Sequence, residues 1–137
     1  MTPAHRIILA GLFVLLAAAG GCEDAAAPEG AIAVPSGREV TLIDVVTDAP
    51  GPYGATARFR FLAPGLGEAD IATSGDDMQA LCEGHALARI AAMAPEPQQI
   101  IISLSGAVVP FGQAAPGVVQ FFEAYRVEGG ACVRDPF

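Results

Sequence analysis

The sequence predicts an α+β domain, in which one helix packs on a mainly antiparallel sheet of about four to six strands. The first observation is a long helical pattern of apolar residues in Asp76–Met93. The second is a set of shorter stretches, before and after it, that alternate between apolar and polar residues as half-buried strands do. Turn-forming Gly and Pro residues separate these stretches. The expected element order is therefore β-β-(β)-α-β-β-β.

Two strands and a third candidate precede the helix. Arg38–Thr47 is rich in β-branched residues and lies between turn segments that contain Pro and Gly. Ala55–Leu62 alternates, so its two phenylalanines lie on one face and its two arginines on the other. Glu68–Ala72 alternates only briefly and is a candidate for a short third strand.

The helix is expected to begin just after Ser74. Ser74 and Asp77 have the spacing of a capping box, whose side chains bind the free amides of a first helical turn. Pro95 disfavours helical geometry in the preceding residue and sets the end. Periodicity does not decide which face is buried, because Cys82 lies on one apolar arc and Ile90 on a nearly opposite one. If Cys82 bonds to a cysteine in the sheet, its arc faces the sheet.

Three strands are expected after the helix. Gln99–Val109 has apolar residues early on both faces, which is typical of a central strand. Val118–Val127 alternates again. A pair of glycines then turns the chain into Ala131–Arg134, which predicts a hairpin.

Composition limits the function. The chain has 137 residues and a formal charge of −8, so it forms one small acidic domain. Binding to nucleic acid or to anionic lipid headgroups requires a basic patch, which argues against both kinds of partner. The sequence contains no dinucleotide-binding fingerprint and no phosphate-binding loop, and we expect no cofactor.

Residues 1–21 have the layout of a lipoprotein-type signal peptide, in which Arg6 precedes an apolar run too short to span a bilayer. The segment that ends in Cys22 resembles a bacterial lipobox, although Ala19 stands where leucine is usual. The resemblance implies cleavage before Cys22 and lipidation of its thiol. The alternatives are ordinary signal-peptidase cleavage after Ala19 and an uncleaved anchor.

This signal predicts a location and a membrane partner. Residues 22–36 have the composition of a flexible tether, and residues 37–137 form the domain. We expect a protein of the bacterial cell envelope that is anchored to the membrane by lipid and faces the periplasm. Glu23 follows the cysteine in place of the Asp of the best-known inner-membrane retention signal, which favours the outer membrane.

Cys82 and Cys132 are the cysteines of the folded part. In an exported chain, two such cysteines favour a disulfide. The alternative is thiol or metal chemistry, in which Cys82 pairs with His85 and Cys132 is a further ligand. A closed zinc site needs a fourth ligand, and His85 is the one histidine left after export. We therefore expect neither a metal site nor a catalytic residue.

The candidate binding residues are aromatic residues of two predicted strands: Phe59, Phe61, Phe121, Phe122 and Tyr125. Core packing is the simpler explanation for them. An exposed aromatic patch would instead dock a protein partner or an apolar ligand. An apolar pocket, if the domain has one, is expected between the helix and the face formed by Phe59, Phe61 and Phe121.

Several short motifs are spread along the domain: Val34-Pro35-Ser36-Gly37, Phe59-Arg60-Phe61, Ala63-Pro64, Asp77-Met78, Leu81-Cys82, Ile102-Ser103-Leu104, Phe111-Gly112 and Gln120–Arg126, followed by Cys132 and Phe137. Together they resemble an uncharacterised alphaproteobacterial family of small exported proteins, a domain of unknown function. The resemblance covers residues 34–137. It implies a paired cysteine and no catalytic residue.

The leading hypothesis is a non-enzymatic cell-envelope lipoprotein whose domain binds a protein partner or supports envelope assembly. The first alternative is a secreted protein that binds a small apolar ligand. A thiol or metal enzyme that uses Cys82 and His85 is the remaining alternative.

Overall fold

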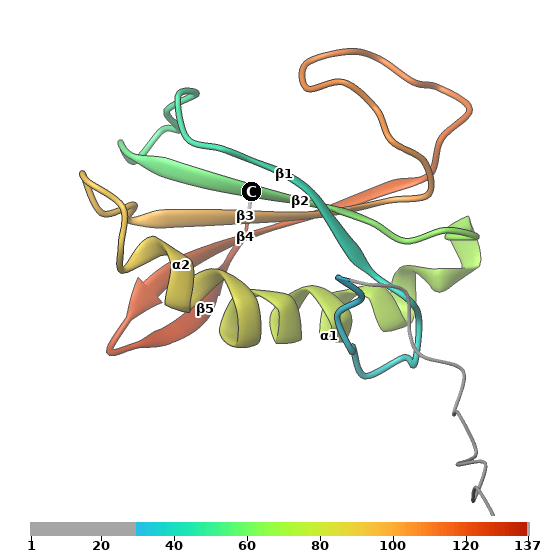
Figure 1. Ribbon diagram of the computed structural model, residues 1–137, viewed down its shortest axis with the longest axis horizontal. Coiled ribbons are helices and arrows are strands. Elements are labelled where there is room, and N and C mark those ends of the chain that lie inside the picture. The colour runs from blue at the N-terminus through green and yellow to red at the C-terminus, as the bar shows by residue number, and fades with distance from the viewer. Residues whose placement is uncertain (1–29, 137) are drawn as a thin grey trace, which may run out of the picture.

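The computed structural model describes residues 30–136, which form a single sheet with a helix on one face (Figure 1). The five strands are β1 (Thr41–Val46), β2 (Thr56–Leu62), β3 (Gln99–Ser105), β4 (Gln120–Glu128) and β5 (Ala131–Asp135). They lie in the order β1-β2-β3-β4-β5; β2 and β3 are parallel, and all other neighbours are antiparallel. The predicted α+β class and the mainly antiparallel sheet are confirmed.

One helical segment of 23 residues connects β2 to β3. It starts with a 3-10 turn at Glu68–Asp70, continues as α1 (Ile71–Leu81), widens into a π-turn at Cys82–Ala86 and ends as α2 (Leu87–Ile90). Two parallel neighbours need a long crossover connection, and the helix supplies it. No helix within residues 30–136 is long and apolar enough to cross a membrane.

The helix begins earlier than predicted, so the capping box at Ser74 and the short strand Glu68–Ala72 are both wrong. Ser74 lies inside α1, where its hydroxyl donates to the Asp70 carbonyl oxygen at 2.8 Å. The Asp70 carboxylate instead accepts the Gly67 amide at 2.8 Å. This bond satisfies one of the free amides with which every helix starts. The N-cap residue of the segment is therefore Gly67, seven residues before the predicted one.

Asp77 is buried within the helix and does not lie in its first turn. Its carboxylate accepts the Ser36 amide at 2.9 Å and the Ser36 hydroxyl at 2.6 Å. These two bonds satisfy a charge that would otherwise be costly to bury. They also fasten residues 30–36, the described part of the predicted tether, to α1, and Val34 in this segment is buried.

The π-turn decides which helix face meets the sheet. Met78, Leu81 and Cys82 are buried, as expected if Cys82 is bridged to the sheet. A π-turn adds about one residue to a turn, which rotates the following residues by roughly 100°. Ile90 is thereby brought from the opposite arc to the sheet and is buried. A regular helical period could not predict this change.

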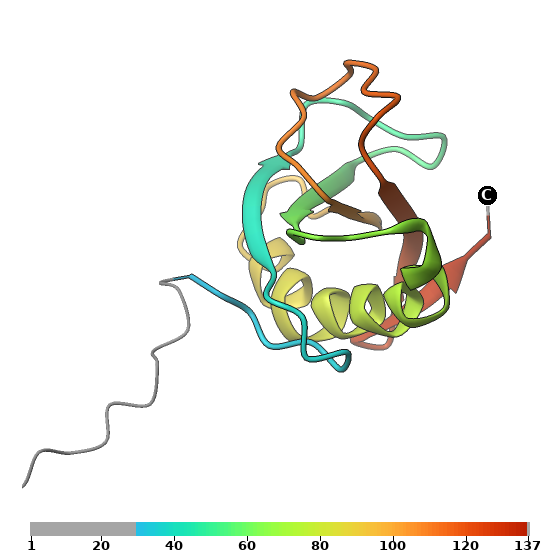
Figure 2. The same cartoon turned by 90° about the vertical axis from the view of Figure 1, so that its right-hand side faces the viewer.

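The core lies between the helix and the sheet. Alternate side chains of the three central strands point toward the helix and are completely buried: Phe59, Phe61, Ile100, Ile102, Leu104 and Tyr125. The opposite surface of the sheet, called here the open face, carries no helix in the described residues. Figure 2 shows that loops 47–55 and 106–119 rise on this side, away from the helix. The open face is therefore bordered by loops.

Candidate functional site

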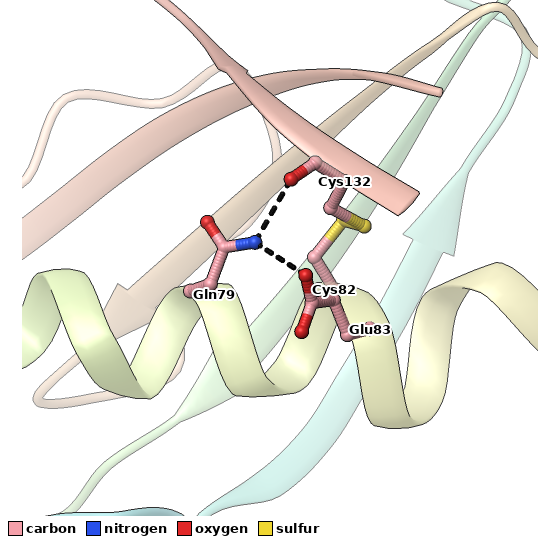
Figure 3. The surroundings of a disulfide bond; sticks show 4 residues. All are labelled: Gln79, Cys82, Glu83 and Cys132. Carbon is pink, nitrogen blue, oxygen red and sulfur yellow. Dashed lines mark hydrogen bonds between the residues drawn. A yellow bond between two sulfur atoms is a disulfide. The ribbon is translucent and has the colours of Figure 1, made fainter. Parts of the chain in front are cut away.

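A disulfide joins Cys82 in the helix to Cys132 in β5, as predicted (Figure 3). The two Cα atoms are 6.3 Å apart. The Gln79 side-chain amide lies beside the bridge and donates to the Cys132 carbonyl oxygen at 2.9 Å and to the Glu83 carboxylate at 2.8 Å. Both cysteines are buried. The bridge is a packed structural cross-link, and Cys82 offers no thiolate while it is oxidised.

His85 packs as an aromatic ring. Its ring centroid lies 6.2 Å from that of Phe59 and 5.4 Å from that of Phe61, with the rings edge to face. Burial lowers the pKa of His85, and the nearby Arg89 guanidinium lowers it further. The Nε2 atom is buried and has no hydrogen-bond partner among the described residues. His85 is therefore mainly uncharged at neutral pH.

The five candidate aromatic residues lie on two different faces. Phe59, Phe61 and Tyr125 are completely buried under the helix, and Phe121 is partly buried against the same core. Phe122 lies on the open face and is 52 % exposed. Core side chains fill the layer between helix and sheet, where we expected an apolar pocket to lie if the domain had one.

Tyr125 is a core residue whose phenol stays protonated. Burial raises the pKa of Tyr125 to about 12, the Glu123 carboxylate adds to this effect, and the Arg134 guanidinium partly offsets it. The phenol is therefore uncharged at physiological pH. Its hydroxyl has no hydrogen-bond partner among the described residues.

A cavity of about 350 Å³ lies on the open face, between the sheet and loop 106–119. Its floor consists of side chains from the three central strands, and its wall consists of loop residues: Arg58, Arg60, Ile101, Ser103, Gln120 and Phe122 below, and residues 109–115 above. This volume lies within the range of about 300–1,000 Å³ that is usual for sites of small molecules. We call it the loop cavity.

Arg60 holds the loop against the sheet. Its Nη1 atom pairs with the Asp44 carboxylate of β1 at 2.7 Å. Its Nη2 atom donates to the carbonyl oxygen of Val109 in loop 106–119. The Arg60 side chain is 13 % exposed and that of Asp44 is 44 % exposed, so water screens this ion pair from the Asp44 side. Asp44 balances the charge of Arg60, and the loop is fixed in place.

Arg58 lies two residues before Arg60 and points to the same face. It donates to the Ala49 carbonyl oxygen of loop 47–55 at 2.9 Å. Within residues 30–136 it has no acidic side chain at ion-pair distance. The Phe111 ring covers both guanidiniums, with its centroid 6.0 Å from Cζ of Arg58 and 5.7 Å from Cζ of Arg60. Arg58 thus brings an unbalanced positive charge to the loop cavity.

A second cavity of about 300 Å³ adjoins the first on the open face. Arg58 and Ile101 line both cavities. The second one is also lined by Tyr53 and by Asp135, whose carboxylate lies 3.6 Å from the Arg126 guanidinium. The two cavities therefore differ in charge, because only the second has an acidic side chain in its lining.

The sequence reasoning did not single out Arg58, Arg60 or Phe111 as site residues. The alternation in β2 correctly placed the arginines away from the core, but charged residues on the outer face of a strand are common. The segment Gln99–Val109 was predicted as one strand, whereas β3 ends at Ser105 and the chain then folds back over the sheet. The available signals were two arginines on one face of a strand and, separately, a segment rich in Pro and Gly at 106–119; only the fold brings them together.

Cys22 lies outside the described residues, so its lipidation and the signal peptide stay predictions.

Comparison with other proteins identifies a family. No curated protein and no solved structure matches the chain. A family model matches residues 15–137, which is most of the sequence. The chain therefore belongs to DUF6497, a family of unknown function.

Proposed function

We propose that this chain is a lipid-anchored, non-enzymatic binding module of the bacterial cell envelope, and that its binding site is the loop cavity. The observation that carries the proposal is the unequal use of the two sheet faces. The helix and the disulfide seal one face. The other face is open and holds a cavity whose lining combines aromatic, cationic and polar side chains. Such a lining is typical of sites that bind small molecules.

The lining supports binding in two ways. Phe111 and Phe122 both line the cavity and are 50 % and 52 % exposed. A ligand that covers these rings removes apolar surface from water, which favours binding. Ser103 and Gln120 place polar side chains on the floor, where they can orient the ligand.

Docking of a protein partner is the second candidate function. Tyr53, which is 63 % exposed, lies in loop 47–55 and lines the adjoining cavity of the open face. Together with Phe111 and Phe122 it adds exposed aromatic surface to that face, and aromatic side chains are enriched in protein interfaces.

The lipid anchor is tested by replacing Cys22 with serine, which has no thiol to receive a lipid. We expect the native chain in the membrane fraction and Cys22→Ser in the soluble periplasmic extract. Far-ultraviolet circular dichroism of the variant checks that the domain is folded. Retention of Cys22→Ser in the membrane fraction would contradict the lipid anchor but would not bear on the cavity.

The cavity is tested with N-phenyl-1-naphthylamine, an uncharged dye that becomes fluorescent in apolar surroundings. The dye is added to the purified Cys22→Ser protein, which needs no detergent. We expect saturable binding, and binding at least about tenfold weaker in the additional variant Ser103→Leu, because leucine on the floor fills the space.

The control for this experiment is Ile71→Ser. Ile71 is an exposed apolar residue of α1 and does not line the loop cavity. We expect its replacement to leave dye affinity unchanged. Absence of saturable dye binding, or equal affinity of the Ser103→Leu protein, would rule out the loop cavity as the binding site.

A further inference from the structure

We infer that the loop cavity takes a small amphipathic carboxylate, a molecule with one carboxylate and an aromatic or aliphatic group, and that Arg58 binds the carboxylate. This inference rests on the proposed binding function of the cavity. It adds the chemical class of the ligand and the residue that recognises it.

The charge balance of the cavity supports an anionic ligand. Asp44 neutralises Arg60, whereas the partner of Arg58 is an uncharged carbonyl group. Among the described residues, none that lines the loop cavity is acidic. A partly buried guanidinium without a counter-ion favours a carboxylate, because its N–H groups can donate two parallel hydrogen bonds to the two oxygens.

The charge of the whole chain indicates that the ligand also has an apolar part. At a formal charge of −8, the chain as a whole repels small anions. A simple anion that touched only Arg58 would gain little in competition with water. Phe111, Phe122 and Ile101 add apolar surface to the same cavity. A ligand that covers this surface gains hydrophobic free energy in addition to the contact with Arg58.

The adjoining cavity is a poorer site for a carboxylate. Arg58 lines it as well, but so does Asp135. Two carboxylates close together repel each other, and each raises the cost of ionising the other. The ligand carboxylate therefore belongs on the side of Arg58 that faces Phe111, and the loop cavity is its site.

The test is competition with the bound dye by 4-phenylbutyrate and by 4-phenylbutan-1-ol. The two competitors share a phenyl ring and a carbon chain. The first ends in a carboxylate and the second in a hydroxyl group. We expect the carboxylate to bind the native domain at least about tenfold more tightly than the alcohol, as for a charge-assisted hydrogen bond. We expect Arg58→Met to remove this preference and Arg58→Lys to retain part of it.

Arg89→Met is the matched control, because it removes the same charge from an exposed helix residue outside the loop cavity. It should keep the preference for the carboxylate. Equal competition by acid and alcohol in the native domain would overturn this inference and leave the proposed function standing. A preference that survives Arg58→Met would overturn the assignment to Arg58. Failure of the dye to bind would remove this inference together with the loop cavity as the proposed binding site. The comparison of acid and alcohol in the native domain tests the ligand class even if Arg58→Met does not fold.

Discussion

Replacing Phe59 with alanine is expected to lower the free energy of unfolding by about 3–5 kcal/mol. Phe59 is completely buried, pairs with Ile102 in the sheet and meets the edge of the His85 ring. Its removal loses buried apolar surface and leaves a space that closely packed neighbours cannot fill. Urea unfolding followed by far-ultraviolet circular dichroism measures the effect.

The matched control is Phe122→Ala on the open face. Because Phe122 is half exposed, we expect its replacement to change the free energy of unfolding by only about 0.5 kcal/mol. The same replacement should weaken dye binding, because Phe122 lines the loop cavity. If Phe59→Ala does not fold, Phe59→Leu preserves more of the volume and serves in its place. A large stability cost at Phe122, with a small one at Phe59, would contradict the assignment of the two faces.

Removing the disulfide with Cys82→Ala and Cys132→Ala together is expected to lower the free energy of unfolding by about 4 kcal/mol. The bridge joins residues 50 positions apart. Cross-links stabilise mainly by restricting the unfolded chain, and closing a loop of this length lies at the upper end of the usual range of about 2–4 kcal/mol. Small domains are stable by only about 5–15 kcal/mol, so the variant should retain a small margin.

The measurement compares urea unfolding of the native chain, with and without reductant, and of the double variant. Reduced native protein and the double variant should unfold at similar urea concentrations, well below the oxidised protein. Gln79→Ala is the control, since it removes the hydrogen bonds beside the bridge but keeps the bridge. We expect it to cost about 0.5–1.5 kcal/mol. An unchanged midpoint on reduction would show that the cross-link does not stabilise the domain.

The fold class could be predicted because burial on one face imposes a period on the sequence. In β2 the alternation of phenylalanine and arginine identified the strand and both of its faces. In the predicted helix, apolar residues recurred over a stretch too long for a strand. Both signals are local, and local signals sufficed for the number and order of the main elements.

The start of the helix could not be predicted, because its determinants are not local. The pair Asp76-Asp77 has the form of a solvated first turn, yet Asp77 is buried by a contact with Ser36, which is 41 residues away. The π-turn likewise cannot be predicted from a pattern based on 3.6 residues per turn. Such contacts are known only once the chain has folded.

The loop cavity could be predicted only in part. The sequence placed Arg58 and Arg60 outside the core, and the structure agrees. The cavity itself depends on a loop that Arg60 holds through Val109, across 49 residues of sequence. Until that contact is known, the two arginines look like ordinary solvated residues of a strand.

The strands lie across the sheet in the same order as along the chain. Each new strand therefore pairs with the strand made just before it, and no pairing waits for a later segment to be inserted between two earlier ones. The sheet can be assembled in the order in which the chain is synthesised, without threading. The last strand also supplies Cys132, so the disulfide can form only after every other strand already has its place in the sheet.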